Sequence, residues 1–191
     1  MESLASRRAG GKSQGRKVLG DVWEKARLLS VAAQYDVSCG GCKVGQRIRG
    51  EMDRWIYPSH LPDGRTVNLL KVLQTNACSV DCYFCENRAG RSFERFLFTA
   101  EELAKTFYEM HEARLVAGLF LSSGIVKNSD STMERMLATA EILRTRYAYR
   151  GYVHLKIMPG SSQAAVERAV QLADRVSLNL EAHLAHTICT S

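Results

Sequence analysis

Three closely spaced cysteines carry the most specific chemistry that this sequence can support. They are Cys78, Cys82 and Cys85, spaced Cys-x3-Cys-x2-Cys in the segment Cys78-Ser-Val-Asp-Cys-Tyr-Phe-Cys85. Cysteine thiolates are the usual ligands of iron–sulfur clusters. A [4Fe–4S] cube has four irons, so three thiolates would leave one iron open to chelate another molecule. The spacing therefore predicts a [4Fe–4S] cluster at these three thiols, with structural zinc or inert thiols as the alternatives.

A second pair, Cys39 and Cys42, stands in the glycine-rich segment Cys39-Gly-Gly-Cys42. Such Cys-x2-Cys pairs form halves of four-cysteine zinc sites, and Cys82 with Cys85 would complete one. That zinc site would take two of the three cluster ligands, and it would not need Cys78. A glycine-rich turn with incidental cysteines is the competing interpretation of the pair.

Basic side chains follow the cysteines and recur in a later apolar run. Arg88, Arg91 and Arg95 would either bind an anionic group or form a solvated basic loop. His154 and Lys156 are two residues apart in an expected strand, so both point to one face of it. On that face they would contact a substrate or serve as satisfied residues of the core.

The surrounding chain alternates between predicted strands and helices. The cysteines directly follow the first strand of the alternation, and helical spacing predicts a further helix before it, over 21–33. Capping residues Thr99, Ser131 and Ser162 are expected to open the later helices. The predicted strands cover 67–73, 115–121, 151–158 and 176–180. This order predicts an α/β fold with a parallel sheet, in which chemistry lies at the carboxyl ends of strands.

The predicted units would make about half of a closed barrel, because a complete one needs about 250 residues. The expected organisation is a disordered basic tail over 1–20, a helical and loop extension over 21–65, a partial TIM-like barrel over 66–181 and a divergent end over 182–191. Within the extension, Tyr57-Pro58 and Leu61-Pro-Asp-Gly64 predict turns. An open sheet is the alternative to the half barrel.

Composition restricts the classes of function. The 191 residues are 46% hydrophobic and 24% charged, which excludes a disordered chain or a coiled coil. The net charge is +6, but Met1 to Lys17 holds five basic residues and one acid, so the remainder is nearly neutral. A basic body that covers nucleic acid is not indicated. Neither a secretory signal nor a membrane span of about 20 apolar residues is evident, so we expect a cytoplasmic protein with reduced cysteines.

The cysteine motif, with Phe84 before its last cysteine, resembles the signature of radical S-adenosylmethionine (radical SAM) enzymes. The flanking sequence resembles one family among them, the radical SAM proteins assigned to DNA modification or repair. The resemblance covers about Ala26 to Glu181. Its motifs include Leu70-Lys-Val-Leu-Gln-Thr-Asn-Ala-Cys78, Gly118-Leu-Phe-Leu-Ser-Ser-Gly124, His154-Leu-Lys-Ile-Met-Pro-Gly160 and Ala173-Asp-Arg-Val-Ser-Leu-Asn-Leu-Glu181.

The resemblance implies that Cys78, Cys82 and Cys85 hold a [4Fe–4S] cluster whose open iron binds S-adenosyl-L-methionine (SAM). An electron donor would then drive cleavage of SAM to methionine and a 5′-deoxyadenosyl radical, which abstracts a hydrogen atom from the substrate. The implied partners are a nucleic acid or nucleotide substrate and a uracil-DNA glycosylase-like protein. The implied cofactor-binding residues are Phe84, Ser122, Ser123, Gly124, Asn179 and Glu181.

The sequence departs from the family in two places. Ser122-Ser-Gly124 corresponds to the superfamily's Gly-Gly-Glu region without its acid, so only a backbone role carries over. After Glu181 the expected fifth and sixth strands are absent, which predicts a truncated enzyme or a half barrel completed by another chain. A zinc-stabilised nucleic-acid-binding module, built on Cys39, Cys42, Cys82 and Cys85, is the competing function.

Overall fold

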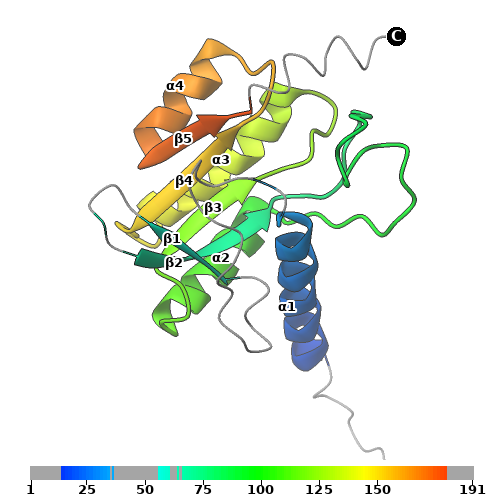
Figure 1. Cartoon of the computed structure of the whole chain (residues 1–191). Helices are drawn as coiled ribbons and strands as arrows, with labels where there is room; N and C mark the ends of the chain where they lie inside the picture. Colours follow the sequence, from blue (N-terminus) through cyan, green and yellow to red (C-terminus); the bar gives the residue numbers. More distant parts are fainter. Residues whose placement is uncertain (1–13, 35, 37–55, 61–63, 65, 180–191) are drawn as a thin grey trace, which may run out of the picture.

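The computed structural model describes residues 14–34, 36, 56–60, 64 and 66–179, and these form an α/β fold (Figure 1). One sheet holds the strands in chain order β1-β2-β3-β4-β5, with β1 antiparallel to β2 and the others parallel. The elements are α1 (Gln14–Ala32), β1 (Ile56–His60), β2 (Thr66–Leu73), α2 (Ala100–Glu112), β3 (Gly118–Ser122), α3 (Ser129–Thr145), β4 (Tyr152–Ile157), α4 (Gln163–Leu172) and β5 (Arg175–Leu178). The predicted α/β class with a parallel sheet is confirmed.

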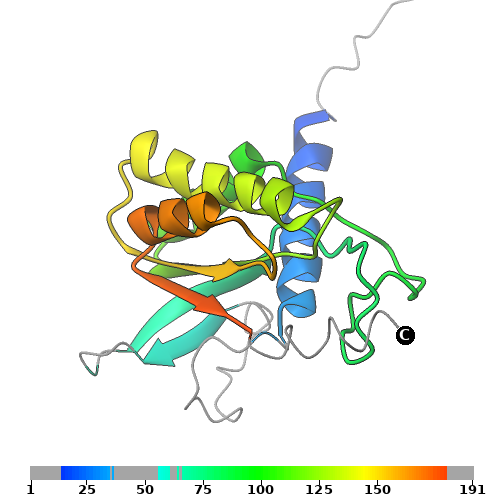
Figure 2. The same ribbon diagram turned by 90° about the horizontal axis from the view of Figure 1, so that it is seen from above.

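Helices α2, α3 and α4 cover one face of the sheet (Figure 2). Each parallel strand is added beside the one before it, so the three crossover helices fall on the same side. The strand side chains that face these helices are apolar and buried, namely Leu70, Val72, Leu119, Leu121, Val153 and Leu155. Helix α1 packs beside this core against β2 and α2. The opposite face of β2, β3 and β4 is called here the helix-free face.

Two predictions for the N-terminal part were wrong. Helix α1 begins at Gln14, so residues 14–20 are helical and do not belong to a disordered tail. Strand β1 occupies the position of the turn predicted at Tyr57-Pro58, and it pairs with β2 along its whole length. Pro58 is compatible with a strand there because β1 lies at the edge of the described sheet, where proline's missing N–H leaves no outer neighbour unpaired.

The helix caps follow the sequence pattern at two of three positions. Thr99 and Glu102 form a capping box on α2, with Glu102 N–H donating to Thr99 Oγ1 at 3.1 Å. Ser162 caps α4 as predicted. Helix α3 instead begins after Asn128, whose Oδ1 accepts from the N–H of Ser131 at 2.8 Å. Asparagine is a strong N-cap residue, so Ser131 belongs to the first turn and is not the cap. Among the described helices, none has the length and apolar character needed to cross a bilayer.

Candidate functional site

Strand β2 leads directly into a long loop that carries all three clustered cysteines. This cysteine loop, residues 76–96, leaves the sheet and returns beside its own starting point. Its two ends are joined by a bridge between Thr75 and Leu97 and by a hydrogen bond from Thr75 Oγ1 to the carbonyl of Phe96 at 2.5 Å. Asn76 joins them again, accepting from Phe96 N–H at 2.7 Å and donating to the carbonyl of Glu94 at 3.0 Å. The loop is therefore closed at its base, at the carboxyl end of β2.

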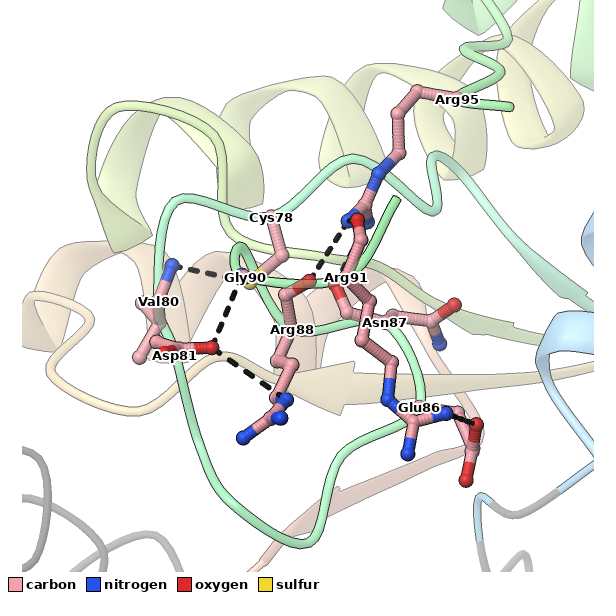
Figure 3. Close-up of polar contacts among 9 residues, drawn as sticks. All are labelled: Cys78, Val80, Asp81, Glu86, Asn87, Arg88, Gly90, Arg91 and Arg95. Carbon is pink, nitrogen blue, oxygen red and sulfur yellow. Dashed lines mark hydrogen bonds and ion pairs between the residues drawn. The ribbon is translucent and has the colours of Figure 1, made fainter. Parts of the chain in front are cut away.

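Arg95 reaches toward other residues of the loop and joins several parts of it (Figure 3). Its guanidinium packs on the Phe93 ring at 3.8 Å from the centroid. It donates hydrogen bonds to four main-chain carbonyls, those of Asn76 (2.5 Å), Asn87 (2.8 Å), Arg88 (2.7 Å) and Arg91 (3.0 Å). A planar guanidinium presents its donors in a fixed fork, which suits it to join several carbonyls at once. Arg95 thus acts as a brace of the loop, in place of the anion-binding role considered from the sequence.

The other two arginines of the loop face carboxylates. Arg91 pairs with Glu86 on the exposed surface. The Nε of Arg88 lies 3.7 Å from Asp81 Oδ1, and this oxygen also accepts from Gly90 N–H at 3.1 Å (Figure 3). These contacts shape the turn after the last cysteine, so the structure gives Arg88 and Arg91 local partners within the loop.

The three thiols are half-buried and none forms a disulfide. The N–H of Val80 points to Cys78 Sγ at 3.4 Å, and Cys85 N–H donates to the carbonyl of Cys82 at 3.0 Å. Burial raises the pKa of the Cys85 thiol, and the charges of Cys78 and Asp36 act in the same direction. The Cys85 thiol therefore keeps its proton at neutral pH, and a metal ion would have to displace it. Between the thiols, Tyr83 and Phe84 are 68% and 64% exposed.

The donor chemistry of this loop fits an iron–sulfur cluster. Thiolates are the expected ligands, and the three thiols share one closed loop at the carboxyl end of a parallel strand. Cys78 and Cys85 lie near enough for one to influence the ionisation of the other. In the part of the chain that the structure describes, no three His, Cys, Asp or Glu side chains are gathered closely enough to hold a metal ion. A [4Fe–4S] cube makes a different demand from a single ion, because each of its thiolate ligands binds a separate iron.

The end of β3 lies against the start of the cysteine loop. Gly124 N–H donates to the carbonyl of Thr75 at 2.8 Å. Both the N–H and the hydroxyl of Ser79 donate to the carbonyl of Ile125, at 2.8 and 2.9 Å. Ser122 is buried and Ser123 is half-buried, and the Ser123 hydroxyl donates to the carbonyl of Gly124. The structure thus brings Ser122, Ser123 and Gly124 beside the loop.

The remaining predicted site residues are less informative. Asn179 is exposed and directly follows β5, at the same carboxyl edge of the sheet as the cysteine loop. Glu181, like Cys39 and Cys42, lies outside the described residues, and so do the basic residues before Gln14. The four-cysteine zinc site therefore has only its Cys82 and Cys85 half within the described structure.

A buried polar group lies on the helix-free face. Lys71 of β2 is in register with Phe120 of β3, which is in register with His154 of β4, and Lys156 lies two residues beyond His154. His154 is completely buried, and the two lysines are 4% and 3% exposed. Lys156 Nζ contacts Asp36 Oδ1 at 2.8 Å, whereas Lys71 Nζ donates to the main-chain carbonyl of Asp36. The sequence predicted no role for Lys71 or Asp36. A charged residue within an apolar strand, as Lys71 is, could have indicated a functional position.

Burial sets the ionisation of this group. It lowers the pKa of Lys71 to about 8, with Asp36 opposing the shift and Lys156 adding to it. The ammonium also lies 5.0 Å from the ring centroid of Tyr57 and 5.6 Å from that of Phe120. Burial lowers the pKa of His154 to about 4, and the positive charges of Arg175 and Lys156 add to this effect. His154 is therefore a neutral imidazole at pH 7.

Comparison with family models and with curated proteins does not add a relative to this description of the site. No protein-family model matches the chain, and no curated protein matches it either.

Proposed function

We propose that this chain is a radical SAM protein in which Cys78, Cys82 and Cys85 hold a [4Fe–4S] cluster and SAM binds at its open iron. The observation that carries this proposal is a closed, three-thiol loop at the carboxyl end of β2, braced by the segment that ends β3. When bound, the cluster and SAM would supply reductive cleavage of SAM to methionine and a 5′-deoxyadenosyl radical.

The sheet supports the proposal that residues 66–181 form part of a TIM-like barrel. Strands β2 to β5 are parallel and in chain order, and their helices cover one face, as in a (βα)8 barrel. The helix-free face would then be the inner face of the barrel. Its polar residues Lys71, His154 and Lys156 would lie beneath the cofactor site, where a substrate group could reach them.

Specific tasks follow for the residues at the carboxyl edge. Arg95 and Asn76 would keep the three thiols on a loop of defined shape. Ser122, Ser123 and Gly124 would offer backbone groups to SAM, and Phe84 would supply an apolar surface next to it. Asn179 and Glu181 would contact the SAM ribose. Each of these cofactor contacts is a proposal that the family resemblance suggests.

The substrate and the partners are also proposals from the resemblance. We propose a nucleic acid or nucleotide as substrate, an electron donor for the cluster, a uracil-DNA glycosylase-like protein as functional partner, and a reducing, cytoplasmic environment for the thiols. The nearly neutral chain beyond residue 17 does not itself support nucleic-acid binding, so this part of the proposal rests on the resemblance alone.

Metal analysis after anaerobic reconstitution tests the proposal. The protein is supplied with iron, sulfide and zinc, and its bound iron, sulfide, zinc and visible absorption are measured. We expect about four irons per chain and a brown protein. Cys78→Ala should abolish both properties, whereas Cys189→Ala, a cysteine outside the loop, should preserve them. One bound zinc that survives Cys78→Ala would overturn the proposal and support the zinc-stabilised module.

A second measurement tests the chemistry of the cluster. The reconstituted protein is reduced with dithionite in the presence of SAM, and 5′-deoxyadenosine and methionine are quantified. Both products should form with the unaltered chain and be absent with Cys78→Ala. A four-iron protein that leaves SAM intact would restrict the proposal to cluster binding.

A further inference from the structure

Among the residues that the structure describes, the charges on the helix-free face do not balance. Two ammonium groups, those of Lys71 and Lys156, converge on one acidic residue, Asp36. Lys156 contacts its carboxylate, while Lys71 donates to main-chain carbonyls, those of Asp36 and, at 3.3 Å, Gln34, and its ammonium lies over the rings of Tyr57 and Phe120. Both lysines are almost completely buried. Burying a charge without a counter-charge is costly, so one carboxylate for two ammonium groups leaves an excess of positive charge that an anion would relieve.

A buried imidazole adds a second, independent sign of a ligand at this position. His154 Nε2 lies 2.8 Å from the hydroxyl of Ser177, whereas its other ring nitrogen, Nδ1, is buried and has no hydrogen-bond partner among the described residues. If Ser177 donates its hydroxyl hydrogen to Nε2, the neutral ring carries its proton on Nδ1. Buried donors are almost always paired, so this N–H calls for an acceptor.

The position of the group is also suited to a ligand. It lies on the sheet face that the crossover helices leave uncovered, and Lys156 is the next-to-last residue of β4, near the carboxyl edge. Ligands of open α/β sheets bind outside the carboxyl ends of the strands. Asp36 is close enough to the cysteine loop to influence the ionisation of Cys85. A molecule held here would therefore lie next to the proposed cofactor site.

We infer that Lys71, Lys156 and His154 form a binding site for an oxyanion, either a phosphate or a carboxylate. When no such ligand is bound, the carboxylate of Asp36 occupies its position. Two ammonium groups and an imidazole N–H match an oxyanion with several acceptor oxygens, and charge-assisted hydrogen bonds of this kind are the strong ones. Asp36 and the ligand compete for Lys156. Assignment of the oxyanion to a substrate rests on the proposed function, but oxyanion binding itself does not.

Calorimetric titration of the full chain tests this inference, with inorganic phosphate and succinate as separate probes. The better probe identifies the ligand class. Lys156→Met should weaken its affinity at least about tenfold, because a charge-assisted contact is lost. Asp36→Asn should tighten it by a similar factor, because the competing carboxylate is removed. Lys105→Met, which removes an exposed lysine of α2, is the matched control and should leave the affinity unchanged.

The contrary outcomes are distinct. Binding that Asp36→Asn fails to tighten, or that Lys105→Met weakens as much as Lys156→Met, overturns the inference. The inference also fails if the Asp36→Asn variant binds neither probe. Circular dichroism of each variant reports folding, and if Lys156→Met does not fold, Asp36→Asn alone decides. The same samples are reconstituted with iron and sulfide. Four irons without oxyanion binding overturn only this inference, whereas oxyanion binding without iron overturns only the proposed function.

Discussion

Gly124 lies so close to the main chain of Ala77 that no side chain fits between them. A Cβ built on Gly124 would stand 2.9 Å from the carbonyl carbon of Ala77, closer still to its oxygen, and 3.3 Å from Cβ of Cys78. The two residues follow neighbouring parallel strands, so this contact fixes the start of the cysteine loop against the end of β3. Its tightness comes from close approach alone, because Gly124 is not among the positive-φ residues.

Gly124→Ala should therefore displace the first cysteine of the loop. The obstacle is backbone and cannot rotate away, so we expect a loss of about 1–3 kcal/mol in the free energy of unfolding. Iron content after reconstitution should fall as well. Gly90→Ala is the matched control, because its Cβ would meet only the exposed carboxylate of Asp81, at 3.1 Å. Denaturant unfolding and iron analysis of both variants check the prediction, and equal behaviour would contradict it.

Arg95→Lys should loosen the cysteine loop while preserving its charge. A lysine ammonium cannot reproduce a planar fork that reaches four carbonyls, so several of these hydrogen bonds are lost. We expect faster proteolysis within the loop and a loss of about 1–3 kcal/mol in stability. Arg91→Lys is the control, because Arg91 makes its ion pair with Glu86 on the surface. Limited proteolysis followed by mass spectrometry locates the cleavage. Unchanged cleavage in Arg95→Lys would show that the brace is dispensable.

Local sequence signals predicted much of the fold. Apolar runs located β2 to β5, and the threonine and serine caps located the starts of α2 and α4. These features depend on neighbours within a few residues, which the sequence displays directly. Strand β1 was missed because Tyr57-Pro58 has a turn-like composition, and only its pairing with β2 makes it a strand. That pairing is a tertiary effect, and the strand propensities of individual residues do not predict it.

In the site, too, features local in the sequence could be predicted, whereas contacts between distant residues could not. The cysteine motif was evident from spacing, the family resemblance pointed to the small residues at the end of β3, and the structure places the two segments side by side. The role of Arg95 was not evident, because its four carbonyl partners acquire their positions only when the loop closes. Asp36 and Lys156 are far apart in the chain, and only the folded sheet brings them into contact. Contacts of this kind are set by topology, so residue type alone does not reveal them.

Thr139→Val should destabilise the junction between β2 and α3. The Thr139 hydroxyl donates to Gln74 Oε1 at 2.9 Å, and Gln74 Nε2 donates to the carbonyl of Phe98 at 2.8 Å, with both side chains buried. Valine would leave the amide oxygen of Gln74 without its donor, at a cost of about 1–3 kcal/mol. Thr145→Val, at an exposed position of the same helix, should change stability by less than about 0.5 kcal/mol. Urea unfolding of the two variants measures the difference, and similar midpoints would contradict the prediction.

His154 should make the stability of the protein fall as the solution becomes more acidic. Its pKa is about 4 in the folded chain and about 6.5 when unfolded, so between these pH values only the unfolded chain takes up the proton. The free energy of unfolding should therefore decline from pH 6.5 to pH 4 by about 3 kcal/mol because of this residue, and below pH 4 its contribution should level off. At pH 7 the imidazole is neutral in the folded chain and mostly neutral in the unfolded one, so the loss of stability from this residue is small there.

The variant His154→Gln isolates this effect. Glutamine can keep a hydrogen bond to Ser177, but it does not titrate, so the free energy of unfolding of the unaltered protein should fall relative to that of the variant as the pH falls from 6.5 to 4. Urea unfolding at a series of pH values measures both curves, and other acidic groups cancel in the comparison because they are common to both proteins. Parallel curves over this interval would mean that His154 takes up its proton in the folded chain as readily as in the unfolded one. Its burial between Phe120 and Ser177 would then not control its ionisation.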